Sequence, residues 1–149
     1  MAETSQQHPQ TPAQPPLFVG VDVGGTNIKI GLVDDAGQSL AYRSIPTESE
    51  RGPEDGVQRI AQAVETLLLE NDLRPSRVAR IGLATPGTMD TQAGVLLEPH
   101  NLPKWFNFPI RDALANAAGH DVTFVNDANA AAYGEYWCGS GQEFRSLVF

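Results

Sequence analysis

The chain has 149 residues, 41% of them hydrophobic and 19% charged, which is the ordinary composition of one globular domain with a buried core. Its formal net charge of -8 and the lack of any basic run argue against nucleic acid as a partner. One cysteine excludes an intrachain disulfide, and no apolar run reaches the length of a membrane span, so we expect a cytoplasmic protein without a membrane partner.

The predicted elements begin after a polar tail. Residues 1–16 contain four Pro and four Gln, so they cannot bury enough apolar surface to offset chain entropy, and we expect them to be disordered. Three strands follow, and the turn residues between them predict an antiparallel meander. These strands are expected at 17–23, 27–33 and 38–45.

Helices and strands alternate in the rest of the chain. Between residues 53 and 71 apolar positions recur at three- and four-residue steps, which predicts an amphipathic helix. The further expected elements are a strand at 78–84, a helix at 109–118, a strand at 122–125, a helix at 127–136 and a strand at 144–149. The order βββαβαβα, with the meander and two parallel strands in one mixed sheet, predicts an α/β lobe of the ribonuclease H-like type found in actin, Hsp70 chaperones and hexokinases.

The turn between the first two strands carries the first chemical motif, DVGGTNIK, at residues 22–29. Two adjacent glycines allow a phosphate to approach the backbone N–H groups, Thr26 adds a hydroxyl donor and Lys29 adds a positive charge. Asp22 could hold Mg²⁺ through water. An ordinary Gly-Gly hairpin is the alternative, but the acid before and the lysine after the turn favour phosphate binding. The candidate cofactor-binding residues are Asp22, Gly24, Gly25, Thr26 and Lys29.

A second motif follows the strand predicted at 122–125. This strand delivers Asn126 and Asp127 at its carboxyl end, where ligand clefts of α/β sheets lie. An ionised aspartate there can accept the proton of a sugar hydroxyl during phosphoryl transfer, which makes Asp127 the candidate catalytic base. Asp127 could alternatively cap the following helix, but capping and catalysis are compatible.

The third group of residues lies between the strand at 78–84 and the helix at 109–118. Gly87 follows a Thr-Pro pair, and Asn101 could pair its amide with sugar hydroxyls or, equally, bond its own backbone in a proline-bounded loop. Trp105 is expected to cover a local apolar cluster.

Four segments together resemble the ROK family (repressor, open reading frame, kinase). They are DVGGTNIK at 22–29, ATPG at 84–87, NLPKW at 101–105 and VNDANAAAYGE at 125–135. The resemblance covers nearly everything from Phe18 onward and implies ATP-dependent phosphorylation of a hexose, with glucose as the expected substrate and Mg²⁺ as the metal ion.

The same resemblance implies a role for each motif residue. Asp127 would be the base, Asn101 and Asn126 would contact the sugar with Gly87 near the ring, and the segment 22–26 would face the nucleotide phosphates. Full-length relatives in this family commonly form homodimers.

The resemblance also implies that residues 17–149 are one lobe of a larger kinase. Family members continue into a second lobe with further sugar ligands and a zinc site, which would lie beyond Phe149, so no residue here is expected to ligate zinc directly. Because phosphoryl transfer needs both lobes to close, we expect weak or no turnover from this chain alone. Two alternatives are a non-catalytic ROK-type regulator, although residues 1–16 cannot form its helix-turn-helix, and an actin-like assembly module.

Overall fold

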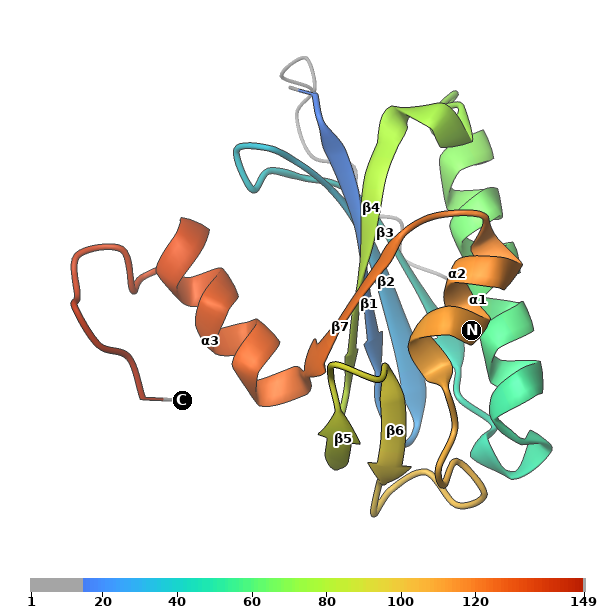
Figure 1. Cartoon of the computed structure of the whole chain (residues 1–149). Coiled ribbons are helices and arrows are strands. Elements are labelled where there is room, and N and C mark those ends of the chain that lie inside the picture. The colour runs from blue at the N-terminus through green and yellow to red at the C-terminus, as the bar shows by residue number, and fades with distance from the viewer. Residues whose placement is uncertain (1–14, 149) are drawn as a thin grey trace.

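A five-stranded mixed sheet forms the centre of the protein (Figure 1). The structure, a computed structural model, describes residues 15–148. The strand order is β3-β2-β1-β4-β7, in which β1, β2 and β3 pair antiparallel and β1, β4 and β7 pair parallel. The five strands are β1 Leu17–Val23, β2 Asn27–Asp34, β3 Ser39–Pro46, β4 Val78–Thr85 and β7 Val122–Asn126.

Two helices, α1 (Pro53–Glu70) and α2 (Ile110–Ala118), cover one face of the sheet (Figure 1). Alternate residues of β1 point to this face, from Leu17 to Val23, and are at most 2% exposed. The stripe of apolar residues along α1 packs against them, because burial of that stripe removes a continuous apolar surface from water. This layer is the hydrophobic core of the described chain.

The third helix, α3 (Asp127–Cys138), lies on the opposite side of the sheet (Figure 1). None of its residues is fully buried, and a cavity of 520 Å³ separates it from the sheet. Three glycines, Gly31, Gly20 and Gly82, are aligned across β2, β1 and β4 and line this cavity. The two faces of the sheet therefore differ: one is densely packed and the other is open beneath α3.

The predicted α/β lobe is confirmed, with one strand wrong and one hairpin missed. The segment 144–149 was expected to be a strand, but its described part, 144–148, is not, because no neighbouring strand supplies hydrogen-bond partners and Phe144 and Val148 are 61% and 99% exposed. The missed hairpin joins β5 (Thr88–Asp90) to β6 (Val95–Glu98). Two short 3₁₀ helices, Ser49–Arg51 and Pro75–Arg77, complete the elements.

Two sequence expectations concern the chain ends and membranes. The predicted tail at 1–16 falls almost wholly outside the described residues. None of the helices within residues 15–148 combines the length and apolar character that a membrane crossing requires.

The core predicts different effects for two adjacent leucines of α1. Leu68 is 1% exposed and Leu69 is 67% exposed. We expect Leu68→Ala to lower the free energy of unfolding by about 2–5 kcal/mol, because it leaves a cavity, and Leu69→Ala to change it by less than about 0.5 kcal/mol. Urea unfolding followed by circular dichroism measures both, and equal effects would contradict this packing.

Candidate functional site

The carboxyl ends of three parallel strands meet at one edge of the sheet. In the register, Asp22 of β1 stands beside Ala84 of β4, and Ala84 stands beside Val125 of β7. Because parallel strands end at the same edge, residues far apart in sequence come together there.

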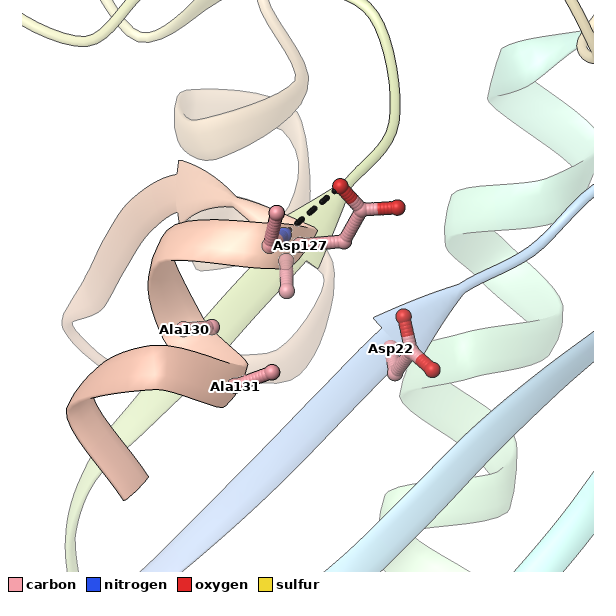
Figure 2. Close-up of a pocket in the computed structure, with 6 residues that line it drawn as sticks. Asp22, Asp127, Ala130 and Ala131 are labelled. Atoms are coloured by element: carbon pink, nitrogen blue, oxygen red, sulfur yellow. Dashed lines mark hydrogen bonds between the residues drawn. The ribbon is translucent and has the colours of Figure 1, made fainter. Parts of the chain in front are cut away.

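A cleft of 450 Å³ opens at this edge (Figure 2). Asp22 from the end of β1 and Asp127 from the first turn of α3 stand on its two sides. The lining residues are Asp22, Ala84, Asp127, Ala128, Ala130 and Ala131. Four of the six are alanines, so the cleft has two carboxylates as its acidic groups and little side-chain bulk between them.

Asn126, and not Asp127, is the N-cap of α3. The Asn126 side-chain oxygen accepts hydrogen bonds from the backbone N–H groups of Ala128, at 3.0 Å, and Asn129, at 3.4 Å. Asp127 accepts a bond from Ala128 N through Oδ1 at 2.8 Å, as Figure 2 shows. Within the described residues its Oδ2 has no hydrogen-bond partner, so this oxygen remains able to accept a proton or a hydrogen bond in the cleft.

The Gly24–Gly25 turn is shaped by contacts within the protein. Gly24 N donates to Asn27 O at 3.0 Å, and a Cβ added at Gly24 would lie 2.9 Å from the same oxygen. A Cβ added at Gly25 would lie 3.0 Å from both Cβ and O of Asn101. The turn that was predicted to hold phosphate therefore touches the loop that was predicted to hold the sugar.

Thr47 supports this turn from below, and sequence reasoning missed it. It is completely buried, its hydroxyl donates to Gly24 O at 2.6 Å, and its backbone N–H donates to Thr26 O at 2.9 Å. The signal that could have found it is its place directly after β3, because the pairing of Asn27 with Pro46 brings the next residue beside the turn.

Arg59 of α1 holds the segment that carries Thr47. Its guanidinium donates to the carbonyl oxygens of Pro46, at 2.6 Å, and of Thr47. It also donates to Asp55 Oδ2 at 2.7 Å, and this hydrogen bond holds the pKa of Asp55 below its usual value. The turn is thus connected to the well-packed helix α1.

Gly87 is required by a close backbone approach. Its φ of 91° lies in the left-handed region, and an added Cβ would lie 2.6 Å from Cα of Pro99. Pro99 belongs to the same loop as Asn101, whose side chain is exposed at the surface. The structure therefore brings Gly87, Gly25 and Asn101 together around one loop.

Lys29 and Glu135 are not part of the cleft. Lys29 pairs with Asp22 across the β1–β2 ladder, but it lines the 520 Å³ cavity beneath α3. Glu135 accepts hydrogen bonds from the hydroxyl and the backbone N–H of Ser140, at 2.8 and 2.9 Å, which lower its pKa. Within the described residues, no cluster of three or more His, Cys, Asp or Glu side chains could hold a metal ion.

Comparison with known proteins assigns the chain to a family. The sequence profile of the ROK family matches residues 18–149, so the chain belongs to the ROK family. It is 39% identical over 131 residues to a glucokinase of Thermotoga maritima and 32% identical over 121 residues to an N-acetyl-D-glucosamine kinase of Escherichia coli. These alignments cover 88% and 81% of this chain but only 40% and 38% of the relatives.

A solved structure supports the fold. The ROK family glucokinase from Streptomyces griseus, in complex with glucose and AMPPNP, matches 85% of this chain at 34% identity with a TM-score of 0.74. The matched part is 38% of that chain. The chain therefore spans about two fifths of the length of these relatives.

The support of the turn by Thr47 predicts a local effect. We expect Thr47→Val to lower the free energy of unfolding by about 1–3 kcal/mol, because it removes the hydroxyl bonded to Gly24 O while keeping the side-chain shape. Amide hydrogen exchange at Gly24 and Thr47, whose N–H groups donate to Asn27 O and Thr26 O, should become faster.

The matched control is Thr66→Val, which removes an exposed hydroxyl bonded to Gln62 O within α1. It should leave exchange at the turn unchanged. Equal exchange rates at the turn in the wild type and in Thr47→Val would show that Thr47 does not hold it.

Proposed function

We propose that this ROK-family chain is the amino-terminal lobe of a hexose kinase, which transfers the γ-phosphoryl group of ATP to a hydroxyl of glucose. The observation that carries the proposal is the cleft that Asp22 and Asp127 share at the ends of the parallel strands. Both the glucokinase of Thermotoga maritima and the N-acetyl-D-glucosamine kinase of Escherichia coli are sugar kinases by name, which supports a sugar as the acceptor.

In this proposal Asp127 is the general base. The sugar hydroxyl oxygen would bond to the γ-phosphorus while the bond from that phosphorus to the β,γ-bridging oxygen breaks and ADP leaves. The unpaired Oδ2 of Asp127 would accept the hydroxyl proton. Phosphoryl transfer depends mainly on positioning and charge neutralisation, so a carboxylate held by the first turn of α3 suffices as the base. Asn126, as the N-cap, sets the direction of that turn and so the place of the Asp127 carboxylate.

The nucleotide would lie on the β1 side of the cleft. Gly24 N–H is engaged by Asn27 O, so the backbone N–H groups of Gly25 and Thr26 are the ones suited to phosphate oxygens. The amino-terminal end of α3 adds a partial positive charge facing the cleft. Asp22 is a hard oxygen donor and fits a Mg²⁺ ion that takes its other ligands from water and phosphate. When Mg²⁺–ATP is bound, ATP would supply the phosphoryl group and Mg²⁺ would neutralise negative charge on the phosphate oxygens. Lys29 would act at longer range, from the neighbouring cavity.

The sugar would lie between Asp127 and the loop at 99–105. Asn101 would bind hydroxyl groups, and Gly87 would keep the loop close to the sheet through its contact with Pro99. The Asn126 side-chain oxygen accepts the capping hydrogen bond from Ala128 N, so the side-chain NH₂ group of Asn126 would be available to donate to a sugar oxygen. Glucose is proposed over N-acetylglucosamine because the glucokinase is the more similar of these two relatives.

The whole protein would supply what this lobe lacks. Since the chain spans about two fifths of its relatives, we propose that a second lobe closes over the cleft and contributes further sugar contacts, the adenosine pocket and a zinc site. The complete protein would act in the cytoplasm as a homodimer. This chain alone would bind sugar and ATP weakly and turn over slowly or not at all.

Replacement of the proposed base tests this function. In the chain extended by the coding sequence downstream of it, Asp127→Asn should lower kcat for glucose phosphorylation by about 10³-fold, because the amide cannot accept the proton. A coupled assay of glucose 6-phosphate formation with ATP and Mg²⁺ measures this effect.

The control is Asp121→Asn, at the opposite end of β7, where the side chain is exposed and 3.5 Å from Arg80. It should retain the wild-type rate. An extended wild-type protein that phosphorylates neither glucose nor any other hexose would refute the kinase assignment.

A further inference from the structure

The loop that carries Asn101 is fixed by close approaches to three glycines on three different elements. Gly25 in the β1–β2 turn touches Asn101, and Gly87 after β4 touches Pro99. The third glycine, Gly56, lies in α1, and a Cβ there would lie 2.5 Å from both Cη2 and Cζ2 of Trp105. Two of these contacts involve the turn and the loop that were predicted to bind ligands, but the third lies against α1, on the packed side of the sheet.

Trp105 is the anchor of the loop within the core. Its ring is completely buried, and its Nε1–H donates to Ser49 O at 3.2 Å. A glycine at position 56 is unfavourable by about 1 kcal/mol relative to alanine in a helix interior, so its presence there is explained by the space that the indole occupies.

Successive backbone turns connect the anchor to Asn101. Trp105 N donates to Leu102 O at 3.1 Å, and Leu102 N donates to Pro99 O at 3.5 Å. Leu102 is completely buried, and the neighbouring Lys104 Nζ donates to Glu50 O at 2.8 Å. Two turns therefore follow each other: Asn101 lies in the first, and the second ends at Trp105 with its buried indole. A displacement of the ring would therefore also move the segment that carries Asn101.

We propose that Gly56 and Trp105 are positioning residues for the sugar. The missing side chain at Gly56 admits the indole beside α1, and the buried ring holds the loop in which Asn101 lies against Gly25. This inference rests on the proposed function, since it takes Asn101 to be a sugar contact. The sugar affinity would then depend on the packing contact between Gly56 and Trp105, although neither residue touches the sugar or ATP.

The physical consequence of filling the space at Gly56 follows from the contact distances. Carbon atoms pack at about 3.5–4 Å, so a methyl group at position 56 forces the ring to move by about 1 Å. A misplacement of that size in a substrate-positioning group costs one to two orders of magnitude in function. Thr47 holds the Gly24 side of the turn independently of the loop, so a displacement of the loop should leave the affinity for the nucleotide unchanged.

The test uses the extended protein and two KM values. In Gly56→Ala, the KM for glucose should rise about tenfold while the KM for ATP stays within about twofold. The double variant Gly56→Ala/Trp105→Phe lacks Cη2 and Cζ2, the atoms that the new methyl group meets, and should recover most of the lost glucose affinity. Trp105→Phe alone is measured beside it, and Gln58→Ala, an exposed change on α1, is the control expected to match the wild type.

A second measurement does not depend on activity. The backbone amide resonance of Asn101 in ¹⁵N-labelled protein should shift in Gly56→Ala and return toward the wild-type position in the double variant. If Gly56→Ala fails to fold, Trp105→Phe, which removes the buried indole and its hydrogen bond to Ser49 O, is compared with the wild type. A higher glucose KM with an unchanged ATP KM supports the proposal, and an unchanged glucose KM overturns it.

The outcomes separate this proposal from the function on which it rests. A folded Gly56→Ala with an unchanged glucose KM and an unmoved Asn101 resonance overturns the positioning role and leaves the kinase assignment intact. Equal rises in both KM values, without rescue, also overturn it, because they indicate general damage. If the wild type phosphorylates no hexose, the proposed function fails, and the Asn101 resonance alone decides whether Gly56 and Trp105 place the loop.

Discussion

The parallel pairing of β1, β4 and β7 is the constraint on which the site depends. It places Asp22, Ala84 and Val125 in one row, and the next residues along the chain put Asp127 at the mouth of the same cleft. The backbone hydrogen bonds of the sheet and the apolar layer beneath α1 and α2 hold this register, because a shift by one residue would turn every buried side chain to the wrong face. The distance between the two carboxylates is therefore set by the core and not by contacts between them.

The packed face of the sheet also reaches the loops around the cleft. Arg59 and Thr47 connect α1 to the Gly24–Gly25 turn, and Gly56 connects α1 to the loop of Asn101 through the indole of Trp105. The other side is different, since α3 has no fully buried residue and stands over an open row of glycines. Asp127 thus lies in the first turn of α3, which Asn126 caps, and the rest of the helix has few contacts with the sheet. The turn and the loop are therefore supported by the packed face, and in the proposed kinase α3 would be the element left to adjust when a second lobe closes over the cleft.

The local motifs were predictable, but the contacts that support them were not. Asp22 lies near the end of β1 and Asp127 follows β7, and both strands have clear apolar patterns, so the meeting of the two carboxylates at one sheet edge could be expected from the parallel topology. Thr47 and Gly56 look ordinary in the sequence, because their importance arises from partners far along the chain. The hairpin β5–β6 was missed because strands of three and four residues carry too short a pattern, and the strand expected at 144–149 was wrong because apolar residues alone do not supply a pairing partner.

The central claim is that the cleft between Asp22 and Asp127 is where a sugar hydroxyl meets the terminal phosphate of ATP. A crystal structure of the extended protein with glucose and a non-hydrolysable ATP analogue tests it most directly. We expect a glucose hydroxyl within roughly 2.6–3.2 Å of the Asp127 carboxylate, with the γ-phosphate between that hydroxyl and the Gly24–Gly25 turn. Glucose bound away from Asp127 and Asn101, or a triphosphate that avoids the turn, would contradict it.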